Sequence, residues 1–263
     1  MTRKTGVCVG DVNAAYDGAI GKIWELLMGE FIHIGGLDET KVLAQKAGIK
    51  KDQYVLDICS ALGGPARFLA KTYGCRVAGL DATLTMHEES KKRTRAAGLD
   101  KLVSFHLGNA LDIPFRAQTF DVVWGEDAWC YITDKDRLIA EAARVLKPGG
   151  TLAFTDWIQA SKAPEEVVTR INTFMIFPDV QTLDGYAALC KKHGLKVTGT
   201  EDLTAQFARL CEGYIQQAGG PLKDRIVALV GPEVFGQLAG EMGFMWEAAK
   251  RGEFGRGRIL AKK

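Results

Sequence analysis

Two aspartates, Asp57 and Asp81, stand 24 positions apart on either side of a turn that contains Gly63. Asp57 lies in the short apolar run 54–58, and Asp81 directly follows a second one, 76–80. The glycine permits a tight turn between the first run and a segment with helical spacing. A carboxylate at this distance can reach the ribose of a nucleoside bound across the first strand–helix–strand crossover. The spacing therefore favours a nucleoside site over an ordinary turn with an unrelated acid.

The other residues of the turn indicate which nucleoside is bound. A dinucleotide site uses G-x-G-x-x-G so that bare backbone touches the pyrophosphate, whereas Cys59 and Ala61 stand at those positions here. Their side chains favour a ligand with an uncharged linker beside the adenosine. We therefore expect S-adenosylmethionine (SAM) rather than NAD, with Cys59 packed against its methionine portion.

Polar residues also end two later apolar runs. Asn109 follows the expected strand 102–107 and could bond an adenine edge, while Glu126 and Asp127 follow the expected strand 120–124. A single polar strand end is more often a helix cap. Because ligands of open α/β sheets bind at the carboxyl ends of the strands, four such ends in series favour a binding site.

The hydrophobic pattern predicts an α/β fold of seven strands with helices on both faces. Besides the segments already named, strands are expected at 151–156, 195–200 and 256–261. Helices are expected at 65–73, 135–146, 164–177, 183–193, 203–217 and 232–251. We expect one domain over 1–263, made of a helical N-terminal cap (1–50), a SAM-binding core (51–157) and a substrate lid with the last strands (158–263).

The motifs LDICSALGGPARFLA, VAGLDAT, LGNALDIPF, FDVVWGEDAW and EAARVLKPGGTLAFTDW resemble those of class I SAM-dependent methyltransferases. The segments AYDGAIGKIWELLMGEFIHIGGLDET and RGEFGRGRILAKK are similar to the small-molecule group that contains sarcosine/dimethylglycine and phosphoethanolamine N-methyltransferases. The resemblance implies a Rossmann-like, mostly parallel sheet with an antiparallel last strand, SAM as the methyl donor and S-adenosylhomocysteine as the product.

The resemblance also implies roles for individual residues. Tyr16 falls on a tyrosine that closes over the active site, Asp127 on the acid after the fourth strand, and Tyr131 where that group has a histidine. These three are the expected catalytic residues, although each could instead be structural. The expected cofactor contacts are Ile32, His33, Asp57, Cys59, Ala61, Gly63, Asp81, Ala82, Asn109, Ala110, Leu111 and Glu126.

The methyl acceptor is less well defined. The basic residues that grip a phosphate in the phosphoethanolamine group fall near Ile176 and Met245, which are apolar here, so a phosphate would lack its partners. Nearby aromatic and sulfur side chains could form a cage for an apolar acceptor or a methylated ammonium, although such residues are more often core. The expected substrate contacts are Trp129, Trp157, Phe174 and Met245.

Composition sets limits on the partners. The 34 basic and 32 acidic residues nearly cancel, which disfavours nucleic acid or an anionic membrane surface as a partner. The chain has no 18-residue apolar run and no signal-peptide pattern, so we expect a cytoplasmic protein without a membrane span. Six scattered cysteines form no C-x-x-C pair, and Cys190 with His193 is too little for zinc, so no metal is expected. The oligomeric state is not defined by the sequence.

These observations predict a SAM-dependent methyltransferase acting on a small molecule, most simply at an amine nitrogen. The first alternative is a C- or O-methyltransferase on a lipophilic ring, quinone or isoprenoid. A second alternative is a SAM-binding regulatory protein without turnover, and a third is an NAD-linked oxidoreductase.

Overall fold

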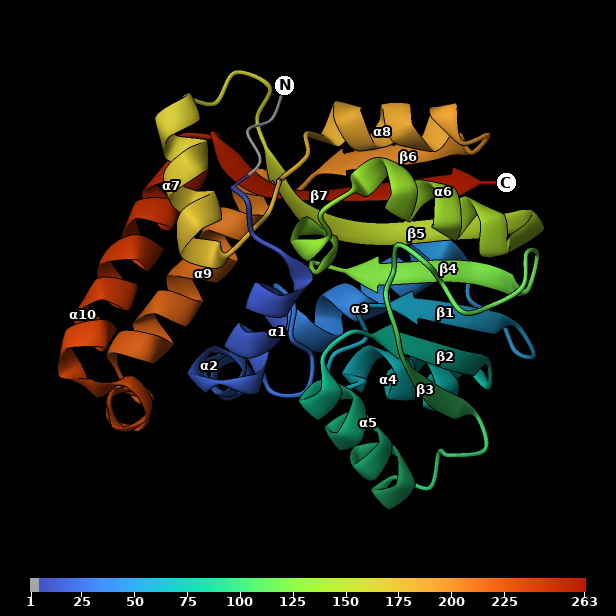
Figure 1. Ribbon diagram of the computed structural model, residues 1–263, viewed down its shortest axis with the longest axis horizontal. Coiled ribbons are helices and arrows are strands. Elements are labelled where there is room, and N and C mark those ends of the chain that lie inside the picture. Colours follow the sequence, from blue (N-terminus) through green and yellow to red (C-terminus); the bar gives the residue numbers. More distant parts are fainter. Residues whose placement is uncertain (1–4) are drawn as a thin grey trace.

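Within residues 5–263, which the computed structural model describes, seven strands form one sheet in the order β3-β2-β1-β4-β5-β7-β6 (Figure 1). β7 runs antiparallel to its neighbours β5 and β6. All neighbouring pairs among the first five strands are parallel. The predicted α/β class with an antiparallel last strand is therefore confirmed. The strands are β1 (Tyr54–Ile58), β2 (Arg76–Asp81), β3 (Val103–Leu107), β4 (Phe120–Glu126), β5 (Leu146–Gln159), β6 (Lys196–Asp202) and β7 (Phe254–Lys262).

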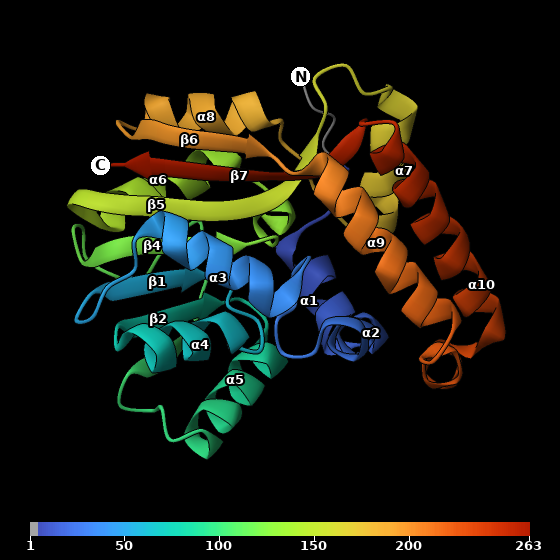
Figure 2. The same cartoon turned by 180° about the vertical axis from the view of Figure 1, so that it is seen from behind.

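Helices cover both faces of the sheet, because the central strands are apolar on both sides. α3 (Gly36–Ala47) and α4 (Gly64–Tyr73) lie on one face, and α6 (Lys135–Val145) and α8 (Leu183–Lys192) on the other (Figures 1 and 2). α5 (Leu84–Ala96) packs beside β3 and β2. α3 therefore belongs to the sheet layers, although the sequence suggested that all of 1–50 forms a cap.

A group of helices gathers beyond the carboxyl ends of the parallel strands (Figure 1). Its members are α1 (Val9–Asp17), α2 (Ala19–Met28), the short 3-10 helix η1 (Trp129–Tyr131), α7 (Glu165–Met175), α9 (Thr204–Gly219) and α10 (Lys223–Lys250). They enclose an apolar cluster separate from the two cores on the faces of the sheet, which includes Trp157, Phe177, Phe207 and Phe254. This group of helices is where the chain departs from a simple layered sheet.

Some element boundaries differ from those expected. β4 continues through Glu126, so this acid belongs to the strand instead of the loop after it. α10 begins at Lys223 instead of Pro232, because the chain is already helical before the proline. Gly231 then leaves helical geometry (φ 80, ψ 162) and Pro232 restarts the helix.

The turn after β1 keeps left-handed backbone geometry without glycine at two of its positions. Cys59 has φ 63 and Ala61 has φ 42, and Gly63 follows with φ 73. A left-handed residue with a Cβ costs about 1 to 2 kcal/mol. The glycine-type turn is therefore formed here at some cost in stability.

Among residues 5–263, none of the helices combines the length and apolar character that crossing a bilayer requires.

Substitutions in this turn should have opposite effects on the free energy of unfolding. Ala61→Gly relieves the left-handed strain but gives the unfolded chain more freedom. We therefore expect the free energy of unfolding to rise by between zero and about 1 kcal/mol. A Cβ at Gly63 would lie 2.4 Å from Cζ of Phe105, so Gly63→Ala should cost about 2 to 4 kcal/mol. Urea unfolding of both variants measures the difference, and equal stability of wild type and Gly63→Ala would contradict the geometry.

Candidate active site

Two carboxylates, one buried and one half-buried, lie where neighbouring strands β1 and β2 end. Asp57 is only 3% exposed, and its Oδ2 has no hydrogen-bond partner within the described residues 5–263. Asp81 accepts bonds from the backbone N–H groups of Ala61 (2.8 Å) and Thr83 (2.9 Å). Burial raises the pKa of Asp57 to about 8, and the carboxylate of Asp81 adds to the shift. The pair suits a ligand that brings hydroxyl donors or a positive charge.

Three further buried polar atoms at this edge of the sheet lack partners in the described part of the chain: Ser60 Oγ, Glu126 Oε1 and His33 Nδ1. Thr40 joins two of these side chains, because its hydroxyl donates to Glu126 Oε2 (3.0 Å) and lies 2.9 Å from His33 Nε2. Burial lowers the pKa of His33 to about 4, so the ring is neutral at pH 7. Buried polar groups without partners are rare in folded proteins and are expected where a ligand or water meets them.

These atoms fit the polar groups of SAM, which carries an ammonium, a carboxylate and two ribose hydroxyls. Asp57, Asp81, Glu126 and His33, all expected to contact the cofactor, lie together at these strand ends. Ile32 lines a small cavity beside them. Cys59, Ala61 and Gly63 form the turn next to Asp81.

The predicted adenine contacts lie in the loop after β3. Asn109 is exposed, and its side-chain Oδ1 accepts a bond from the backbone N–H of Leu111 (2.9 Å). Ala110 is buried in the core, with Leu111 packed against that cluster. The side-chain carbonyl of Asn109 already shapes its own loop, and the adenine contact stays a prediction.

Helix α1 lies across the end of β2. Asn13 donates to the backbone carbonyl of Ala82 (3.1 Å) and accepts from the hydroxyl of Thr83 (3.1 Å). This contact places Tyr16, one turn further along α1, within electrostatic range of Asp81 and Cys59. The N-terminal segment therefore covers the strand ends that carry the acids.

Tyr16 and Tyr131 meet edge to face, with ring centroids 5.5 Å apart. Burial raises the pKa of both hydroxyls well above the ordinary tyrosine value. Both therefore stay protonated at physiological pH, so they can donate or accept a hydrogen bond but cannot take up a proton as a base. The two tyrosines expected to be catalytic come together, whereas the sequence alone placed them more than a hundred residues apart.

Two cavities meet at this tyrosine pair. The smaller, of about 20 Å³, also reaches Ile32, His33, Asp127 and Trp157. The larger, of about 220 Å³, lies between α1–α2 and α7, α9 and α10. Residues that line both are Tyr16, Trp24, Tyr131 and Met175.

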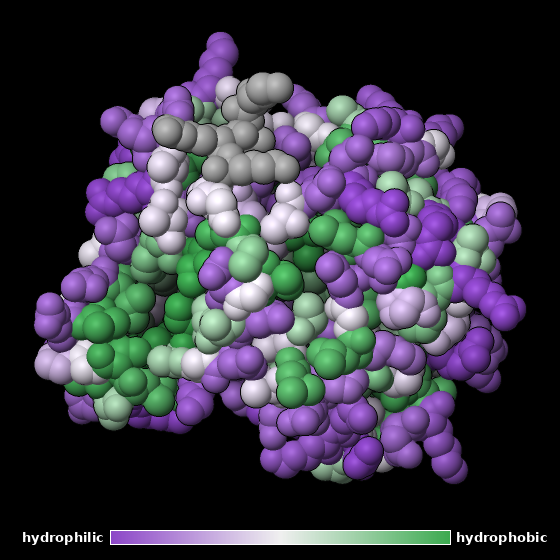
Figure 3. Space-filling model, in the orientation of Figure 1, coloured by the Kyte–Doolittle hydropathy of each residue, from purple (hydrophilic) through white to green (hydrophobic). Residues whose placement is uncertain are grey.

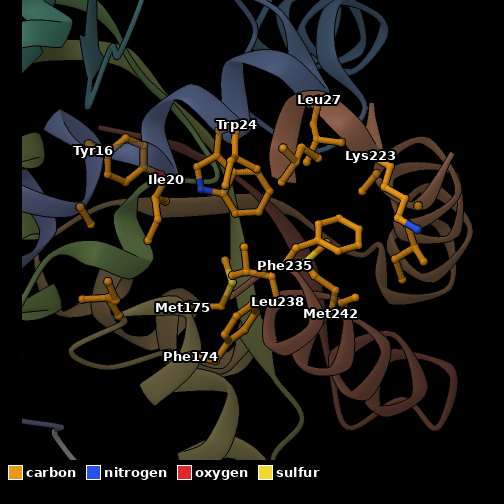
Figure 4. Close-up of a pocket in the computed structure, with 18 of the residues that line it drawn as sticks. Tyr16, Ile20, Trp24, Leu27, Phe174, Met175, Lys223, Phe235, Leu238 and Met242 are labelled. Atoms are coloured by element: carbon orange, nitrogen blue, oxygen red, sulfur yellow. The ribbon is translucent and has the colours of Figure 1, made fainter. Parts of the chain in front are cut away.

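The larger cavity is apolar almost throughout. Every residue that lines it is apolar, aromatic or glycine, except Lys223. Figure 4 shows Tyr16 and Lys223 on opposite sides, with Trp24, Leu238 and Met175 between them. On the surface, apolar residues gather around a hollow over α2 and α10 (Figure 3).

Asp127 lies at the smaller cavity, but both of its carboxylate oxygens already accept hydrogen bonds. Oδ1 accepts from Nε of Arg256 (2.8 Å) and Oδ2 from the backbone N–H of Ile34 (2.9 Å). Its own backbone is left-handed, with φ 54. These bonds give Asp127 a structural task, while its predicted catalytic role stays a prediction.

The arginines of β7 belong to the site, although they were not among the residues expected from the sequence. Arg256 is buried and also donates to Glu39 (2.7 Å) and Thr155 (3.0 Å), and Arg258 donates to the same Glu39 oxygen (2.7 Å). The available signal was a pair of arginines at alternate positions of the expected strand 256–261, since two charges on one face of a strand need partners wherever that face is buried. Two of their acidic partners, Asp127 and Glu39, lie more than a hundred residues away in the sequence.

Two of the four expected substrate contacts line the cavities and two do not. Phe174 lines the larger cavity and Trp157 the smaller. Trp129 is fully buried and stacks on Phe154, with ring centroids 4.2 Å apart, and Met245 is 1% exposed in the packed helical cluster. Trp129 and Met245 thus lie in packed clusters away from the lining of both cavities, and their contact with an acceptor stays a prediction.

The cysteines near the site carry no sign of nucleophilic activity. Burial raises the pKa of both Cys59 and Cys130 well above the ordinary thiol value, so both are thiols instead of thiolates. Within residues 5–263, no group of three or more His, Cys, Asp or Glu side chains is arranged to hold a metal ion.

Residues 56–154 match a family model described as a methyltransferase domain. A sarcosine/dimethylglycine N-methyltransferase of Halorhodospira halochloris is 34% identical over 60% of this chain and 57% of its own length. The chain thus spans little more than half the length of this relative. A (+)-O-methylkolavelool synthase of Herpetosiphon aurantiacus is 27% identical over 88% of this chain and 86% of its own length.

The fold is also similar to a solved structure. A phosphoethanolamine N-methyltransferase 2 of Haemonchus contortus, in complex with S-adenosyl-L-methionine, matches with a TM-score of 0.87 and 22% identity. The match covers 98% of this chain and 60% of that one. At this identity the likeness concerns the fold.

Removal of one ion from the Arg256 network should lower stability strongly. Asp127→Asn leaves a buried guanidinium without one of its two carboxylates, and breaking a buried pair costs about 3 to 5 kcal/mol. Glu201→Gln is a matched control, because Glu201 pairs with Arg258 at the edge, where its side chain is 36% exposed, and should cost about 1 kcal/mol or less. Urea unfolding measures the free energy of unfolding of both variants. Equal losses would show that the Asp127–Arg256 pair stabilises the fold no more than the Glu201–Arg258 pair does.

Proposed function

We propose that the chain is a SAM-dependent methyltransferase that acts on a small molecule, because residues 56–154 match a family model described as a methyltransferase domain. The observation that carries the proposal is the meeting of two halves at Tyr16 and Tyr131. On one side lie buried acids with unsatisfied oxygens, and on the other an apolar cavity large enough for an organic molecule.

In this proposal the sheet edge holds the cofactor. Asp81 receives the ribose hydroxyls, as acids at the end of a second strand do in folds of this kind. Asp57, Ser60, Glu126 and His33 offer the unpaired atoms for the methionine end. The bound cofactor supplies a methyl group already activated on a sulfonium.

The residues of this chain then have to align the acceptor and exclude water. Such orientation can contribute about 7 to 11 kcal/mol in the best intramolecular cases. Tyr16 and Tyr131 are protonated hydroxyls at the junction and can orient an acceptor atom by a hydrogen bond. α1, held to Ala82 and Thr83, keeps solvent from the same point.

Two classes of acceptor are consistent with this arrangement. An amine nitrogen is the leading class and accords with the name of the H. halochloris relative. An amine would have to arrive unprotonated, because the tyrosines cannot remove its proton and both Asp127 oxygens are engaged. C- or O-methylation of a lipophilic molecule is the second class, and the apolar lining of the larger cavity favours it.

The remaining assignments are also proposals. We propose that α7, α9 and α10 form the substrate lid predicted for 158–263, because they line the larger cavity. All six cysteines are unpaired, as is usual in a reducing compartment, which supports a cytoplasmic location. The near-neutral net charge of +2 supports a protein without a nucleic-acid partner.

Turnover tests the function directly. The protein should release S-adenosylhomocysteine from SAM when supplied with an acceptor from a panel of amines, phenols, quinones and sterols. Binding of SAM without release for any acceptor class would favour the regulatory alternative, and binding of NAD in its place would favour an oxidoreductase.

Asp81→Ala should weaken SAM binding. The loss of hydrogen bonds to a charged group corresponds to about 1.5 to 3 kcal/mol, or roughly ten- to a hundredfold in Kd. Asp100→Ala, an exposed acid before β3, is the control and should bind like wild type. Calorimetric titration measures Kd for both, and an unchanged value for Asp81→Ala would remove this residue from the site.

SAM binding should also depend on pH through Asp57. With a pKa raised to about 8, this carboxyl is mostly protonated at pH 7 in the ligand-free protein. A cationic ligand favours the charged carboxylate, so binding should release a proton, and affinity should rise with pH until about pH 8 and then level off. Calorimetry in buffers of different ionisation heat detects the proton, and Asp57→Asn should abolish its release. Equal proton release by wild type and Asp57→Asn would exclude Asp57 as the source.

A further inference from the structure

The larger cavity differs from the rest of the site in its chemistry. Around about 220 Å³, the helices α2 and α10 contribute side chains such as Ile23, Trp24, Phe235 and Leu238. An apolar cavity of about 150 Å³ already stays dry and accepts benzene, so this one has room for a larger hydrocarbon body.

A carboxylate or phosphate close to the tyrosine pair would find no cationic partner among the lining residues of this cavity. Lys223 is its only charged lining residue in the described part of the chain, and it is exposed on the side opposite Tyr16 (Figure 4). Asp127, which lines the smaller cavity together with both tyrosines, is already paired with Arg256. A carboxylate or phosphate on the acceptor would therefore be buried without a fork of donors, which is strongly unfavourable.

The larger cavity adjoins the smaller one, because four residues line both. Tyr16, Trp24, Tyr131 and Met175 line both the larger cavity and the smaller one that reaches His33 and Asp127. Tyr16 lies on α1, which is hydrogen-bonded through Asn13 to Ala82, the residue that follows Asp81. An occupant of the larger cavity thus has one end at the point where a methyl group would be delivered.

From this arrangement we infer that the methyl acceptor is an uncharged, mainly hydrocarbon molecule larger than one benzene ring. Its reactive atom lies at the Tyr16–Tyr131 pair, and its apolar body extends between α2 and α10 toward Lys223. This inference rests on the proposed methyltransferase function and assigns acceptor selection to the α9–α10 hairpin.

Variants that fill the cavity test the inference without turnover. N-phenyl-1-naphthylamine, an uncharged apolar fluorophore, is titrated in the presence of S-adenosylhomocysteine. Ala218→Phe in α9 should weaken its binding at least tenfold, because Ala218 lines the cavity. Gln217→Phe, at the neighbouring exposed position outside the lining, should leave binding unchanged.

A second matched pair on α10 guards against a local folding defect. Leu238 lines the cavity, so Leu238→Trp should weaken probe binding as Ala218→Phe does. Gln237 is exposed, so Gln237→Trp should bind the probe like wild type. SAM affinity should be unchanged in all four variants. Equal probe binding by the lining and control variants would overturn the inference.

Turnover by the wild-type enzyme is the second test of the inference. Uncharged terpenoid alcohols, hydroquinones and apolar amines should be methylated with a kcat/KM at least tenfold above that of analogues carrying a carboxylate or phosphate on the apolar body. Preferred turnover of sarcosine, dimethylglycine or phosphoethanolamine would overturn the inference and leave the methyltransferase function intact. Failure to bind SAM would instead count against the function itself.

Discussion

A buried guanidinium, that of Arg256, fixes the end of the sheet on which the site depends. A charge taken out of water is tolerated only with closely placed partners, since the desolvation cost is several kcal/mol per ion. Arg256 meets this requirement with Asp127 after β4 and Glu39 on α3, and Arg258 shares the second of these. The last strand, the middle of the sheet and an N-terminal helix are thereby locked together. Because Asp127 also accepts from Ile34, the same network positions the segment that carries His33.

The site divides into a polar half and an apolar half that have different structural origins. The polar half comes from strand ends, whose positions are set by the ladder of backbone hydrogen bonds between β1, β2 and β4. The apolar half comes from helices that belong to no regular layer of the fold. Such a division lets one sheet keep its cofactor chemistry while the helices determine which acceptor is admitted.

The two tyrosines define what chemistry can occur where the halves meet. Their hydroxyls are held neutral by burial, and the neighbouring thiols Cys59 and Cys130 are neutral for the same reason. Neither the tyrosines nor these thiols can therefore take a proton from the acceptor. The four groups stay protonated because burial removes them from water, and their residue types alone would not have indicated this.

The sequence by itself determined the sheet and the placement of its acids. Period-two and period-3.6 patterns are local, and Asp57 and Asp81 follow from strand ends whose neighbours lie within about 25 residues, which is the range of one crossover. Only the tertiary structure decided which partner each side chain meets. It brought Tyr16 to Tyr131, engaged Asp127 with Arg256, and turned Trp129 and Met245 into the core. These outcomes depend on contacts between residues distant in the chain and on the rotation of a helix about its axis. A local pattern shows that a face is apolar, but the packing of several helices together decides whether that face encloses a cavity or fills a core.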